Sequence, residues 1–246
     1  MATSKNVLAM NPLYNGVKVC SLVNRSIPYV RFGVVMQAGS RYENFREQGA
    51  SHFLRVMHAC STEHSTIVEM TKRIEHAGAA FSAVNTRDSI IYWLECMSDK
   101  IEELAPLILQ ATLAPKLYAW EMEDCRKRVK LEVEMQKSSL SYMLSKLIHQ
   151  SSFKGGLSNS LLISEDNIER LGHTKLIDYH HKNFTSDRLT LVGVGQMNRD
   201  FLANMGQQIQ KSKSDSSESS MFYPRELRKE YPCNSTFVTF SFNACP

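Results

Sequence analysis

Residues 49–56 read GASHFLRV and lie where an alternating segment gives way to helix-forming sequence. Before them, residues 28–39 carry apolar side chains at every second position, among them Val30, Phe32 and Val34. This alternation predicts a half-buried strand. Helix-forming sequence continues to about residue 77, so the stretch predicts a passage from a strand into a helix.

Five segments of the chain have the composition of strands, and helix-forming sequence separates them into groups. Asn24–Ile27 has turn chemistry, so the first two strands are expected to form a hairpin. Arg87 and Asp88 form the only break between the third and fourth strands. Short connections of this kind predict an antiparallel sheet with helices packed on one face, hence an α+β fold. The expected strands are 16–23, 28–39, 79–86, 88–97 and 188–195.

Helices are expected in the intervals between these strands. Ile101, Leu104 and Ile108 fall at helical spacing, and Pro106 near the middle of that segment predicts a kink or a late start. The remaining helical sequence lies in residues 117–149 and in 165–184.

Composition narrows the classes of function. Lys and Arg number 29 against 25 Asp and Glu, and the small excess is spread along the 246 residues. This distribution predicts no nucleic-acid partner. No apolar run approaches the roughly 20 residues of a membrane span, so membrane association is expected only through a partner. The six cysteines contain no C-x-x-C pair, which predicts free and mostly buried thiols.

His52 begins a frame that resembles a zinc site with two parts replaced. A peptidase of the inverted type needs H-x-x-E-H, in which two histidines bind the metal and the Glu activates water. Here Arg55 stands at the position of the base and Val56 at the second ligand. A fixed positive charge one helical turn from a divalent cation repels it. The frame therefore predicts no catalytic residue, no bound metal and no cofactor.

The other histidines are not expected to replace the missing ligand. His52, His58 and His64 follow one another at intervals of six residues, whereas only i+3 and i+4 partners meet on a helix. His180 and His181 are adjacent and diverge by about 100° on a helix. Both are expected at the surface.

Several ordered blocks of the chain resemble the mitochondrial processing peptidase family over about residues 14–209. Residues 36–56 resemble its A-G-S-R-Y-E strand end followed by G-x-x-H-[FL]-L-E-H. Residues 74–108 are similar to its I-E-x-x-G-G, strand-pair and helix block, and residues 184–197 to N-F-x-x-x-R-M-x-L-x-G-x-G. The resemblance implies the α+β fold of that family's N-terminal half.

Within the family, H-F-L-R and residues 86–96 look most like the core protein 2 branch, found in ubiquinol–cytochrome c reductase. The resemblance implies a non-catalytic scaffold at the matrix side of the mitochondrial inner membrane, supporting complex III assembly and electron transport. Its partners would be a core-protein-1-like subunit and other complex III subunits, with membrane association only through the complex. The alternatives are a noncatalytic subunit of the processing peptidase that binds presequences for a zinc-bearing partner, and a metallopeptidase. A third hypothesis is that the isolated half folds poorly and has no function as it stands.

The resemblance also places the third zinc ligand of active relatives. That Glu falls at Glu132, or at Glu134 under a shifted alignment. Because no metal site is expected here, either side chain is expected to be a solvated surface charge.

Family subunits contain two similar halves joined by a linker, which implies a division of this chain. Residues 1–210 correspond to the first half. Residues 211–220, KSKSDSSESS, have the composition of a linker. Residues 221–246 are expected to begin an incomplete second homologous domain, with a strand candidate over 235–242.

Overall fold

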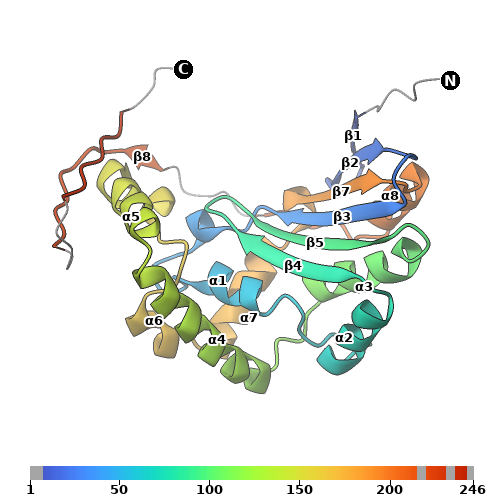
Figure 1. Ribbon diagram of the computed structural model, residues 1–246, viewed down its shortest axis with the longest axis horizontal. Helices are drawn as coiled ribbons and strands as arrows, with labels where there is room; N and C mark the ends of the chain where they lie inside the picture. Colours follow the sequence, from blue (N-terminus) through green and yellow to red (C-terminus); the bar gives the residue numbers. More distant parts are fainter. Residues whose placement is uncertain (1–7, 215–219, 231–235, 243–246) are drawn as a thin grey trace.

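A six-stranded sheet forms the centre of the protein in the computed structural model, which describes residues 8–214, 220–230 and 236–242 (Figure 1). The strand order is β1-β2-β7-β3-β5-β4. β2 and β7 are parallel, and every other neighbouring pair is antiparallel, so the sheet is mixed. The strands are β1 (Leu8–Pro12), β2 (Lys18–Val23), β3 (Tyr29–Met36), β4 (Ala80–Asn85), β5 (Ile90–Met97) and β7 (Leu189–Gly195).

Helices cover one face of this sheet, and the expected α+β class is confirmed (Figure 1). Phe32, Val34, Leu94 and Leu191 are fully buried beneath them. The larger helices are α2 (Ile67–His76), α3 (Ile101–Leu113), α4 (Ala119–Lys137), α5 (Leu140–Ser152), α7 (His173–Asn183) and α8 (Arg199–Gln207). The short helices are α1 (Ala50–Val56) and α6 (Glu165–Arg170), with 3-10 turns at Ser40–Tyr42, Gly156–Ser158 and Ser186–Arg188.

The hairpin expected between the first two strands is wrong, because β7 lies between β2 and β3. β7 contains no charged residue, so it can be buried between two neighbours as a central strand. Residues 24–28 therefore cross the end of β7, and the Asn24 N–H donates to the Gly195 carbonyl at 3.0 Å. A Cβ on Gly195 would lie 2.2 Å from the Tyr29 carbonyl oxygen, so only glycine fits this crossing.

The predicted helical segments are divided more finely than the sequence indicated. The segment at 47–77 becomes α1 and α2, and the segment at 117–149 becomes α4 and α5. α3 begins at Ile101 and continues through Pro106, so a late start is wrong. Pro106 is solvent-exposed in the second turn, where water can bond the carbonyl that its missing N–H leaves unpaired.

The described part of the C-terminal segment lies along the end of α5. β6 (Phe153–Lys154) pairs with β8 (Met221–Phe222) in an antiparallel two-stranded sheet. The strand expected over 235–242 does not form in residues 236–242, where Phe240 and Phe242 are exposed. Residues 215–219 of the predicted linker lie outside the described part of the chain.

No helix among the described residues has both the length and the apolar composition that a membrane span requires.

Candidate functional site

A buried carboxyl group holds the start of α1, the helix that carries His52. Glu43 accepts hydrogen bonds from the Gly49 and Ser51 N–H groups at 2.8 Å, and from Ser51 Oγ at 2.6 Å. Burial raises the pKa of Glu43 to about 7. Gly49 has φ of 96°, and a Cβ there would lie 2.5 Å from the Ile163 Cβ. Glycine at this position therefore allows the strand-to-helix passage that the sequence predicts.

His52 is completely buried and bonded through both ring nitrogens. The Ile163 N–H donates to Nδ1 at 3.4 Å, which places the ring proton on Nε2. Nε2 then donates to Glu132 Oε2 at 3.0 Å. Burial lowers the pKa of His52, and the nearby Arg55 lowers it further, so the imidazole is neutral at neutral pH.

Arg55 lies one helical turn beyond His52 and pairs with the same carboxylate oxygen of Glu132. The hydrogen bond from His52 lowers the pKa of Glu132, and the charge of Arg55 lowers it further. The expectation that Glu132 is a solvated surface charge is therefore wrong: α4 brings it onto α1, where it joins the other two side chains. We call His52, Arg55 and Glu132 the α1–α4 triad.

Val56 and Glu134 do not belong to the α1–α4 triad. Val56 is buried in the hydrophobic core and offers no donor atom. Glu134 pairs instead with Lys137 at 2.9 Å, on the exposed side of α4.

The triad does not fit a zinc ion, which takes three protein ligands in catalytic sites and four in structural sites. His52 and Glu132 supply two potential donors, and a guanidinium is bonded to the second. Across the described residues, no group of three or more His, Cys, Asp or Glu side chains is placed to hold a metal ion.

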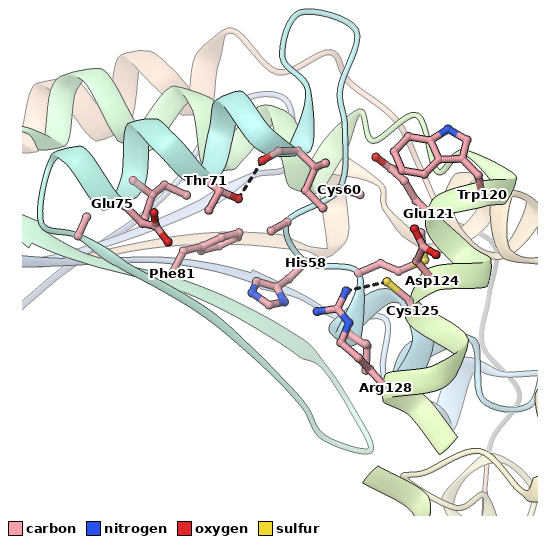
Figure 2. Close-up of a pocket in the computed structure, with 16 residues that line it drawn as sticks. His58, Cys60, Thr71, Glu75, Phe81, Trp120, Glu121, Asp124, Cys125 and Arg128 are labelled. Carbon is pink, nitrogen blue, oxygen red and sulfur yellow. Dashed lines mark hydrogen bonds between the residues drawn. The ribbon is translucent and has the colours of Figure 1, made fainter. Parts of the chain in front are cut away.

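A cavity of about 400 Å³ lies beside the C-terminal end of α1, between α2 and the start of α4 (Figure 2). Ile67 and Ile74 contribute to its apolar lining. Phe81, Glu75 and Asp124 also line it (Figure 2). The sequence did not predict this cavity, because its walls come from segments that only the fold brings together.

The polar groups in this cavity do not form a nucleophile and base pair. The Arg128 guanidinium donates to Cys125 Sγ at 2.8 Å (Figure 2). His58 bonds to the Arg55 carbonyl at 3.1 Å. Burial raises the pKa of Cys125 and raises that of Cys60 to about 12. Both thiols therefore remain protonated, and they are free and buried as the sequence predicted.

The paired histidines of α7 have different environments. His181 is exposed as expected, whereas His180 is buried, so the surface expectation is wrong for His180. His180 Nε2 bonds to the Thr112 carbonyl oxygen at 3.0 Å, and its ring stacks on Phe184 at 4.1 Å. Adjacent helix positions diverge by about 100°, which allows one of them to face the core.

The fold and the remnant of the zinc motif define a class of protein, and comparison with known families agrees. The family described as Insulinase (Peptidase family M16) matches residues 18–165, so the chain belongs to this peptidase family. The family resemblance read from the sequence is confirmed.

Individual members of the family show which proteins this chain is similar to. The chain is similar to cytochrome b-c1 complex subunit 2, mitochondrial, from Rattus norvegicus (31% identity) and Homo sapiens (29%), over 188 residues in each case. These alignments cover 76% of this chain and 41% of either relative. It is also similar to mitochondrial-processing peptidase subunit alpha from Solanum tuberosum, with 27% identity over 190 residues, covering 77% of this chain and 38% of that relative. The chain thus spans about two fifths of the length of these mitochondrial proteins.

Proposed function

We propose that this chain is a non-catalytic core subunit of mitochondrial ubiquinol–cytochrome c reductase, the cytochrome b-c1 complex. It would support assembly of the complex and electron transport at the matrix side of the inner membrane. A core-protein-1-like subunit would be its immediate partner. The observation that carries the proposal is the pairing of Arg55 with Glu132, together with the similarity to cytochrome b-c1 complex subunit 2.

The charges of the α1–α4 triad support the non-catalytic part of this proposal. The carboxylate of Glu132 is already neutralised by the Arg55 guanidinium. A zinc ion would have to displace that cation and then accept a site with two protein ligands. Without a Glu at position 55, no carboxylate is available there to activate water.

Metal analysis of the purified chain tests the proposal that the chain is non-catalytic. The parent chain is expected to hold no stoichiometric zinc. Arg55→Glu combined with Val56→His restores the missing base and ligand beside His52 and Glu132, and this variant is expected to bind about one zinc per chain. Val56→His alone is the matched control, because it adds the ligand but retains the guanidinium. Stoichiometric zinc in the parent chain would refute a non-catalytic role.

Complex III isolated from mitochondria that express this chain tests the scaffold role. We expect mass spectrometry to identify the chain in the native complex, in a constant ratio to the other subunits. Its consistent absence from intact complex III would contradict the assignment.

The similarity to a processing peptidase subunit supports a second candidate, a noncatalytic subunit that binds presequences for a zinc-bearing partner. The discriminating measurement is binding of an Arg-rich presequence peptide to this chain, with and without a catalytic processing peptidase subunit. Binding strengthened by that subunit, without co-purification with complex III, would favour the second candidate.

A further inference from the structure

A second cavity, of about 430 Å³, lies between the start of α1, α5 and the described C-terminal segment, and it contains none of the α1–α4 triad. Its walls come from three separate parts of the chain. The lining residues are Glu43, Gln48, Gly49, Lys146, Gln150, 158–160, 162–164, Asn167, Arg225 and Leu227.

Lys146 on α5 places a half-buried ammonium group in this cavity. Its Nζ atom forms no hydrogen bond or ion pair within the described part of the chain. Burial lowers the pKa of Lys146, and the charge of Lys229 lowers it further, so a second cation is close by. A partly buried cation without a counter-ion is unfavourable, and an anion in the cavity would relieve this.

Arg225 adds a further positive charge, and its position is determined by hydrogen bonds to α5. Its backbone N–H donates to the Ser151 carbonyl at 2.7 Å, and its Nη2 donates to the Gln150 carbonyl at 2.9 Å. The remaining N–H groups of a guanidinium can bind an oxyanion in a two-pronged geometry.

Neutral polar groups line the cavity together with Lys146 and Arg225. Gln48 and Asn159 bond to each other at 3.4 Å, and Asn167 donates to Gln48 at 3.5 Å, so these amides form one chain along the wall. Leu162 and Leu227 supply apolar surface for a short carbon skeleton. A pocket with a few converging polar groups and an apolar remainder is typical of small-ligand sites.

Glu43 is the carboxyl group in the lining, and its charge would oppose an anion. Three donors at the start of α1, from Gly49 and Ser51, already bond its oxygens, and burial raises its pKa to about 7. The raised pKa leaves part of this carboxyl population uncharged at neutral pH. The positive charges of Lys146 and Arg225 outweigh the remainder.

We propose that this cavity binds a small organic anion, whose carboxylate or phosphate oxygens are held by Lys146 and Arg225. The proposal is independent of the scaffold function. It applies to the α5 side of the protein, whereas the lost zinc chemistry concerns the α1–α4 triad.

Isothermal titration of the purified 246-residue chain at low salt tests the proposal with two probes, succinate and inorganic phosphate. We expect one-to-one binding of at least one probe, and the probe that binds identifies the carboxylate or the phosphate as the recognised group. Lys146→Gln is expected to weaken binding at least about tenfold, because it removes a charged hydrogen-bond donor. Lys72→Gln, which removes an exposed lysine of α2, is the matched control and should leave binding unchanged.

Three results would overturn the proposal. The first is no binding of either probe below about 10 mM, which is weaker than a built site would give. The second is equal weakening by Lys146→Gln and Lys72→Gln, which would indicate attraction by net charge alone. The third is binding of putrescine, a dication of similar size to succinate, as tightly as succinate. If Lys146→Gln does not fold, Arg225→Gln provides a second test, because Arg225 is exposed and its replacement disturbs no buried packing. Arg225→Gln should also weaken binding at least about tenfold.

Discussion

The coupling between Arg55 and Glu132 can be measured with a double-mutant cycle. The variants are Arg55→Met, Glu132→Gln and the two combined, which remove the charges with little change in side-chain size. If the guanidinium is the counter-ion of Glu132, the double variant should lose less stability than the two single losses added together.

The expected coupling follows from burial. The side chains of Arg55 and Glu132 are 19% and 37% exposed. Hydrogen bonds to charged groups contribute about 1.5–3 kcal/mol when buried, whereas exposed ion pairs contribute about 0–1 kcal/mol. Because solvent screens the Glu132 carboxylate, we expect a coupling near 1 kcal/mol at pH 7.

This coupling should depend on pH in a defined direction. The pKa of Glu132 is held below its ordinary value of 4.5 in the folded chain. The stabilisation is therefore complete above 4.5 and is lost as the pH falls through the lower, folded-state pKa.

Urea unfolding of the four proteins gives the coupling, and the Arg31–Glu95 pair on the sheet gives the control. Those side chains are 63% and 43% exposed, so their coupling should be below about 0.5 kcal/mol. A value for the Arg55 pair no larger than that of the control pair would refute the claim that Arg55 is the counter-ion of Glu132.

Two further predictions concern buried groups. Burial lowers the pKa of His180 from 6.5 to about 4, so stability should fall by about 3 kcal/mol as the pH decreases between these values. His180→Gln should remove this dependence in acid unfolding, whereas His181→Gln, at an exposed position, should preserve it. Gly49→Ala combines positive φ with a clash against Ile163 and should lower the free energy of unfolding by about 2–4 kcal/mol in urea. Gly78→Ala, at φ of 60° with open space, should lower it by only about 1 kcal/mol; equal losses would contradict the role of the clash.

The buried face of β3 was predictable, because local alternation decides it. Val30, Phe32, Val34 and Met36 are all buried on one side, as their spacing indicated. The neighbours of β3 were not predictable in the same way. The turn chemistry of 24–27 is real, but which strand lies beside β3 depends on residues 189–195, far along the chain.

The candidate site was also only partly predictable, because some of its features depend on local sequence and others on contacts between distant segments. The local frame shows that Arg55 and Val56 stand where the zinc motif has a Glu and its second His. The contact of Glu132 with Arg55 depends on the packing of α4 against α1. The family resemblance hinted at this packing, because it places the third zinc ligand of active relatives at Glu132. The burial of His180 against α3 had no local signal, since its neighbour His181 is exposed.

The central position of β7 has a consequence for how the chain folds during synthesis. Lys18 pairs with Thr190, and Val30 pairs with Gly195. The centre of the sheet is therefore built from strands that are far apart in the sequence. Contacts of such long sequence separation form slowly. Until residues 189–195 leave the ribosome, β2 and β3 each have an unpaired edge, and unpaired edges promote association. The nascent chain is therefore most exposed to association through these edges before residues 189–195 are made.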